Sequence, residues 1–241
     1  MRQPLACADL VATLIALPRP ILFLDTAAIL DILRVPFRRE LQVDIVDSAV
    51  TVVDDALADP RRIWLVSTAN VMHELDGRRG SVTDELHRGM RELSKSITHI
   101  SSLARMVFPE KRIASPEGVE LILGERILQI MDRLVDSTMV YRGTATCIGK
   151  ASERVWAGIP PASEAKQEYK DCEIFEEFLE LLTTIRGQGF EQPAVFVSPN
   201  REDYGPPPDG HPRVKSDLAA LDAQYAANLS WARKMARSGA S

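Results

Sequence analysis

Cysteine is scarce in this sequence, with three residues that stand far apart in a chain of 241. Cys7, Cys147 and Cys172 have no metal-ligand spacing with one another or with the four histidines, so a zinc site is not expected. Nor does an odd number of separated cysteines indicate a disulfide framework. Reduced thiols in a cytoplasmic protein are the simplest interpretation.

Long hydrophobic runs are also missing. No apolar stretch reaches the roughly 18 to 20 residues that a membrane-spanning helix needs. The apolar stretch near the N-terminus, residues 5–17, is interrupted by Asp9 and Thr13. We interpret it as an amphipathic helix and not as a signal peptide. We therefore expect a cytoplasmic protein that has no membrane partner.

The chain has no excess of positive charge, since its formal net charge is −5. This value argues against a protein that holds nucleic acid mainly by bulk electrostatic attraction. It does not exclude a nuclease, because a cluster of carboxylates that binds metal contributes negative charge itself. Apolar residues make up 45% of the chain, which is typical of a folded globular protein and not of a disordered one.

Three short apolar runs alternate with patterns of helical period. Residues 21–24, 63–67 and 194–198 are each continuous enough for a buried strand of a parallel sheet. Helical patterns are predicted over residues 5–17, 27–34, 38–58, 70–75, 81–106, 116–135, 170–186 and 215–237. This alternation predicts an α/β fold with a mostly parallel central sheet.

We predict a single domain over residues 1–241. Its core spans about residues 21–205, with a helical elaboration over about 81–136 inserted between the second and third strands. A C-terminal helix over about 215–237 closes the domain. Residues 137–170 contain several glycines and prolines and are expected to form a partly helical, loop-rich connection. No strand can be identified after Asp203.

Acidic residues lie near the end of each predicted strand. Asp25 directly follows the first strand, Glu74 lies on the helix after the second, and Asp203 follows the third. Asp171 begins the helix that leads into the third strand. Because ligands gather at the carboxyl ends of parallel strands, we expect these side chains to converge. Carboxylate oxygens suit Mg²⁺ or Mn²⁺, and a pair of such ions can hydrolyse a phosphodiester.

Each of these acids also has a plain structural interpretation. Asp25 can cap the next helix, and Glu74 can belong to a solvated helix face. Asp171 can favour a helix N-terminus through the helix dipole, and Asp203 can belong to a polar turn. Only their joint placement at one edge of the sheet favours a metal site.

Four segments resemble a PIN-like family of bacterial nucleases, in the order in which that family has them. They cover the chain from about residue 21 to 205: LFLDT at 22–26, VMHELD at 71–76, KDCEIFEEFLEL at 170–181 and AVFVSPNREDY at 194–204. The resemblance implies a PIN-like three-layer sandwich with a site that depends on Mg²⁺ or Mn²⁺.

The resemblance also implies roles for single residues. Asp25, Glu74 and Asp171 would form the acidic core, and the fourth position would fall to Asp203 or to Asn200. The neighbouring polar supports would be Thr26 and Ser198.

Three further residues complete the set of candidates. Glu176 matches a recurrent acid of this branch, but it lies about 140° around a helix from Asp171, so it either orients a ligand or makes a structural bond. Lys170 and Arg201 adjoin the site segments and are candidates for contacts with phosphate.

The function that follows is a metal-dependent nuclease, an endoribonuclease in the first place, of the kind used as a toxin or in defence. RNA would be the substrate, with single-stranded DNA as the alternative, and an antitoxin or a second copy of the chain would be a partner. The alternative is a PIN-like scaffold without activity that binds RNA or protein. A haloacid-dehalogenase-like phosphatase is disfavoured, because residue 27 is alanine where that family has the second aspartate of Asp-x-Asp.

Overall fold

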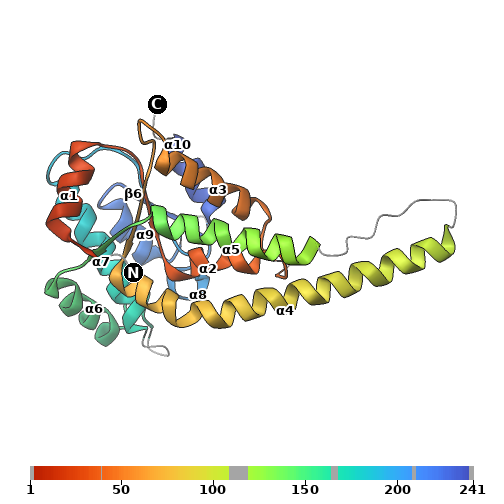
Figure 1. The fold of residues 1–241 in the computed structure, drawn as a ribbon. Helices are drawn as coiled ribbons and strands as arrows, with labels where there is room; N and C mark the ends of the chain where they lie inside the picture. Colours follow the sequence, from red (N-terminus) through yellow and green to blue (C-terminus); the bar gives the residue numbers. More distant parts are fainter. Residues whose placement is uncertain (1–2, 39, 109–118, 164–167, 208–209, 239–241) are drawn as a thin grey trace.

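A computed structural model describes residues 3–38, 40–108, 119–163, 168–207 and 210–238 (Figure 1). In these residues six strands form one sheet in the order β1-β4-β3-β2-β5-β6, and all neighbouring strands are parallel. The strands are β1 (Leu5–Ala6), β2 (Ile21–Leu24), β3 (Trp64–Thr68), β4 (Met139–Arg142), β5 (Ala194–Val197) and β6 (Ala223–Ala226). The α/β class with a parallel sheet is confirmed.

Helices cover both faces of this sheet (Figure 1). They are α1 (Cys7–Ala16), α2 (Thr26–Arg34), α3 (Asp44–Leu57), α4 (Ala69–Val107), α5 (Val119–Ser137), α6 (Ala145–Ala157), α7 (Tyr169–Arg186), α8 (Arg201–Tyr204), α9 (Pro212–Ala219) and α10 (Leu229–Ser238). On one face α7 packs with α1 and α6, and on the other α10 and α3 pack together beside α5 and α2. This is the layered arrangement expected of a PIN-like sandwich.

Strand β2 lies inside the sheet, where its apolar side chains are buried on both faces of the sheet. All four of its residues are fully buried, which explains the continuous apolar run. Phe23 contacts Phe178 of α7, with 4.9 Å between ring centroids, and Phe196 of β5, with 5.7 Å. These aromatic contacts fix α7 against the strands whose carboxyl ends carry the acidic residues.

Three strands differ from the sequence-based expectation. The two-residue β1 and the later strands β4 and β6 were not predicted. Residues 137–170, expected to be loop-rich, hold β4 and the three-turn helix α6. The helix expected over 215–237 is interrupted by β6 and becomes α9 and α10. These strands are short and only partly buried, so they lack the apolar runs that identify β2, β3 and β5.

The helical elaboration also differs in its boundaries. The helix α3 begins at Asp44, later than the expected residue 38. The two expected helices at 70–75 and 81–106 form one helix of 39 residues, α4, which runs through Gly77 and Gly80. Its distal half projects away from the sheet (Figure 1). The start expected for the next helix, Pro116, lies outside the described residues. None of the described helices is long and apolar enough to cross a membrane.

Candidate metal centre

Acidic side chains converge at the carboxyl ends of β2, β3 and β5. They line a cavity of about 690 Å³ together with polar and basic neighbours. The lining residues are Asp25, Thr26, Ala27, His73, Glu74, Gly77, Arg78, Glu168, Tyr169, Lys170, Asp171 and Asn200. Residues that are far apart in the sequence meet here because parallel strands end at a common edge. We call this space the acidic cavity.

Asp25 is held rigidly between β2 and α2. It caps α2, and its Oδ1 accepts a hydrogen bond from the Thr26 amide at 2.7 Å. Its Oδ2 accepts one from the Ser198 hydroxyl at 2.6 Å. The side chain is only 3% exposed, and this burial raises its pKa to about 6, although the two hydrogen bonds act in the opposite direction. Asp25 therefore caps a helix, as one of the two interpretations from sequence has it, and it also lines the cavity.

Glu74 reaches the cavity from the second turn of α4. Its Oε2 accepts a hydrogen bond from the Thr26 hydroxyl at 2.8 Å, and its Oε1 lies 2.9 Å from the Arg78 guanidinium. Thr26 thus links Asp25 and Glu74, since its amide binds one carboxylate and its hydroxyl the other. The two acids share a fixed geometry because a single residue orients both.

Asp171 and Asp203 form the second half of the site. One carboxylate oxygen each from Glu168, Asp171 and Asp203 lies within 4.8 Å of the others. Burial, together with the nearby charges of Asp25 and Asp203, raises the pKa of Asp171 well above its usual value. The Asn200 amide donates a hydrogen bond to Asp203, so Asn200 supports the carboxylate at the fourth position.

Asp203 lies in the short helix α8, which is held in place by the packing of the next residue, Tyr204. Tyr204 is fully buried, its ring lies 4.9 Å from that of Phe196, and its hydroxyl donates a hydrogen bond to the Asp171 carbonyl. Asp203 itself is 6% exposed. The aromatic core therefore fixes the distance between α8 and the start of α7.

This set of donors fits a hard divalent cation. Carboxylate oxygens are the ligands that Mg²⁺ and Mn²⁺ favour, and a bound cation would offset the burial and the neighbouring acidic charges that raise the pKa of Asp171. Asp171, Asp203 and Glu168 are close enough to share one ion. Asp25 and Glu74 line the same cavity and could contribute to it or to a second ion.

Glu168 was not among the residues predicted from the sequence. It immediately precedes α7, at the end of the segment interpreted as loop-rich, and it lies three residues before Asp171. A Glu-x-x-Asp spacing at a helix start places both side chains on one side of the first turn, and this spacing was the available signal.

Glu176 lies away from the acidic cavity. It is 5% exposed and pairs with Arg154 of α6. Arg154 also lies 2.7 Å from Asp217 of α9 and donates to the Pro160 carbonyl at 2.7 Å. Of the two roles considered for Glu176, the geometry corresponds to the structural bond, which joins α6, α7 and α9.

The two predicted phosphate contacts have different positions. Lys170 is exposed and lines the acidic cavity. Arg201 lines a separate cavity beside Gln42 and Pro207. Lys170 is therefore the better placed of the two for a substrate at the acidic residues.

Comparison of the chain with protein-family models, with curated proteins and with solved structures returns no significant match.

Proposed function

We propose that this protein is a divalent-metal-dependent nuclease that hydrolyses phosphodiester bonds in RNA. The observation that supports it best is the convergence of five carboxylates, of which four line the acidic cavity and the fifth, from α8, lies beside two of them. They are Asp25, Glu74, Glu168, Asp171 and Asp203. The resemblance of four segments to PIN-like nucleases selects RNA as the substrate, with single-stranded DNA as the alternative.

Some of these residues would bind the metal ion or the phosphate, and others orient the metal-binding side chains. Bound Mg²⁺ or Mn²⁺ would supply positive charge at the scissile phosphate and lower the pKa of a coordinated water. Asp171, Asp203 and Glu168 would hold the ion with oxygens that already lie close together. Thr26 and Ser198 orient Asp25, so little reorganisation is needed when substrate binds. The Lys170 ammonium at the cavity would attract the phosphate backbone.

Cleavage of labelled RNAs and single-stranded DNAs in Mn²⁺, Mg²⁺ or EDTA tests this proposal. Wild-type protein should cleave with either metal and be inactive in EDTA. Asp25→Asn and Asp171→Asn keep the shape of each side chain but remove its charge, and each should lower the rate at least about 100-fold.

Asp84→Asn is the matched control. Asp84 is an exposed acid of α4 outside the acidic cavity, so this variant should cleave at the wild-type rate. A wild-type protein that neither cleaves nor binds metal would favour the inactive scaffold. Equal activity of wild type and Asp171→Asn would contradict the proposed site.

A further inference from the structure

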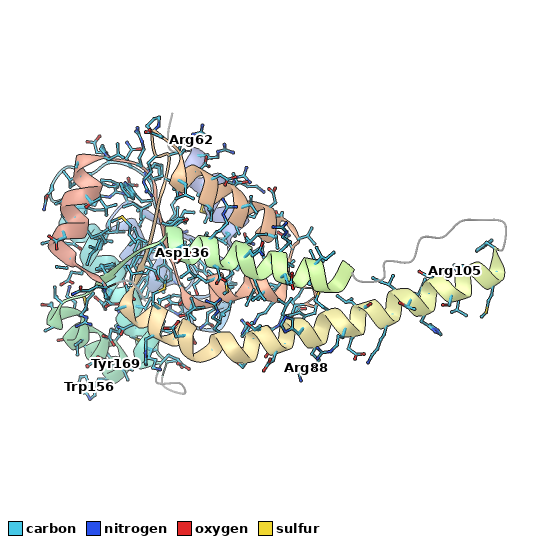
Figure 2. The ribbon with its side chains drawn as sticks, viewed as in Figure 1. Arg62, Arg88, Arg105, Asp136, Trp156 and Tyr169 are labelled. Atoms are coloured by element: carbon cyan, nitrogen blue, oxygen red, sulfur yellow. The ribbon has the colours of Figure 1, made fainter. Side chains whose placement is uncertain are left out.

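The distal part of α4 extends beyond the helices that cover the sheet (Figure 1). We call residues 93–107 of this helix the α4 arm. Arg105, near the end of the arm, lies well away from the strands (Figure 2). At 1.5 Å per residue the arm spans about 22 Å, which is long enough to pair with another helix over several turns.

An apolar stripe runs along one side of α4 and continues into the arm. Its members recur at alternating intervals of four and three residues, the heptad spacing of helices that pair with another helix. They are Leu86, Met90, Leu93, Ile97, Ile100, Ala104 and Val107. The first two are buried in the domain, but Ile97 is 43%, Ile100 64% and Val107 65% exposed. The stripe therefore begins in the core and becomes exposed in the arm.

The positions that flank the stripe in the arm carry no charge. They are Ser94, Ser96, Ser101 and Leu103. The arm's lysine and arginine, Lys95 and Arg105, lie about 120° or more around the helix from the stripe. Charges at the flanking positions of paired helices select a partner of opposite charge. Their absence favours pairing with an identical helix, because two copies of the arm meet without repulsion.

The start of α5 limits how far a second helix can extend along the stripe. An added Cβ on Gly124 of α5 would lie 3.9 Å from the His87 ring of α4, and α5 runs in the opposite direction to α4 (Figure 1). Since α5 begins at Val119, five residues before Gly124, it reaches only to about residue 92 of α4. Ile122 and Leu123 near its start are exposed. A helix antiparallel to the α4 arm would therefore continue the line of α5 and end against these two side chains.

The arm of a second copy fits this place. When two arms lie antiparallel with their tips against α5, Ile100 of one copy faces Ala104 of the other, which places a small side chain opposite a large one. Ile97 then faces Val107 in the same way. Each copy uses the same surface, as pairing about a two-fold axis requires.

The apolar surface that this pairing covers is close to what a specific interface needs. Each copy contributes six exposed large apolar side chains, which are Ile97, Ile100, Leu103, Val107, Ile122 and Leu123. At roughly 60 to 120 Å² for each side chain, the pair buries on the order of 1,000 Å². Stable complexes bury about 1,200 to 2,000 Å² in total, so we expect a dimer that dissociates on dilution.

We propose that two copies of this chain pair antiparallel through their α4 arms. The proposal does not depend on the proposed nuclease, since the arm lies outside the acidic cavity. Sedimentation velocity at protein concentrations from about 1 to 200 µM tests it. Wild-type protein should change from monomer to dimer as the concentration rises. A protein that stays monomeric throughout would overturn the inference and leave the stripe to a different protein.

Two matched variants locate the interface. Ile100→Asp places a charge in the stripe and should abolish the dimer, because the carboxylates would be buried without a partner. Thr98→Asp adds the same charge on the outer side of the arm and should leave the dimer intact. Both side chains are exposed in a single copy, so far-UV circular dichroism should show unchanged helix content. A dimer that persists in Ile100→Asp, or is lost in Thr98→Asp, would overturn the assignment of the stripe.

A mixture of two variants tests the direction of pairing. Ala104→Lys alone should weaken the dimer, but Ala104→Lys mixed with Ile100→Asp should associate at least about tenfold more tightly than either variant does with itself. In the antiparallel pair the new aspartate and the new lysine face each other, whereas in a parallel pair they do not meet. A mixture that associates no more tightly than the separate variants would overturn the antiparallel arrangement.

Discussion

At the residue scale, the buried charges of this protein serve two different purposes. Asp25 is buried and Asp171 is half-buried, both close to other acids, and burial raises the pKa of each. Glu176 is buried to a similar degree as Asp25 but faces the guanidinium of Arg154. A cluster of acids without a cationic partner is typical of a cation-binding site. An acid that is paired with a cation, such as Glu176, forms a structural ion pair.

The framework role of Glu176 gives a first prediction. Arg154→Met should lower the free energy of unfolding by about 3 to 5 kcal/mol, because it leaves the buried carboxylate of Glu176 without its cation and removes one of the two arginines beside Asp217. Urea denaturation measures the loss. Removing the unpaired charge as well, in Arg154→Met with Glu176→Leu, should recover part of it. A Glu176→Gln variant that folds normally but no longer binds Mn²⁺ would contradict this role.

Glu177, a buried acid of α7, gives a second prediction, which concerns pH. Burial raises its pKa from 4.5 to about 7. The folded state therefore binds this proton more strongly than the unfolded state, so its contribution to stability is present below pH 4.5 and is lost as pH rises through about 7. Glu177→Gln cannot ionise, so between pH 5 and pH 8 it should gain about 1 to 3 kcal/mol relative to wild type.

Urea denaturation of both proteins at the two pH values measures this difference. The comparison cancels the titration of other groups that the proteins share, and the nearby Glu173 is present in both. A difference between wild type and variant that is the same at both pH values would contradict the raised pKa.

At the scale of elements, the sequence indicates buried strands well and edge strands poorly. The strands β2, β3 and β5 are continuous apolar runs, because both of their faces are covered. The edge strand β6, with the sequence AQYA, is partly exposed and is set by its pairing with β5. Pairing of this kind is a tertiary effect that no local pattern encodes.

The helix α4 shows how packing overrides glycine as a helix breaker. The sequence between Gly77 and Ser81 suggested an interruption, but the helix continues because its buried face packs against α2 and α5. Gly80 has no atom within 4 Å of an added Cβ, whereas a Cβ on Gly89 would lie 2.5 Å from the Cβ of Phe37. Close packing against Phe37 therefore requires glycine at position 89, whereas a larger side chain has room at position 80.

A third prediction follows from this contrast. Gly80→Ala should stabilise the protein by about 0.5 to 1 kcal/mol, because alanine has the higher helix propensity and meets no obstacle. Gly89→Ala should destabilise it, since the clash with Phe37 outweighs that gain. Thermal unfolding of the two variants beside wild type measures both signs. Stabilisation by Gly89→Ala would show that α4 and Phe37 are farther apart than described.

At the scale of the whole molecule, the acidic cavity depends on parts of the chain that are more than 170 residues apart. Asp25, Glu74, Asp171 and Asp203 were candidates from the sequence, because each lies next to a strand or helix that the sequence predicts. The fold places the first three in the lining of the cavity and Asp203 beside Asp171. Glu168 was not a candidate, because it ends the segment 137–168, where β4 and α6 were not recognised.

The carboxylate arrangement also explains why an acidic protein is compatible with the proposed substrate. The acids that contribute to the net charge of −5 include those at the cavity, where a bound cation would offset them. Nucleic acid would then be attracted locally, by the metal and by Lys170, and not by the overall charge.

The most direct measurement is anomalous diffraction from crystals grown with Mn²⁺, because it locates the ion without reference to any substrate. We predict a strong anomalous peak between Asp171, Asp203 and Glu168, with Asp25 lining the same cavity, and no such peak in crystals of Asp171→Asn. Crystals saturated with Mn²⁺ that show no peak in the acidic cavity, or a peak that persists in Asp171→Asn, would contradict it.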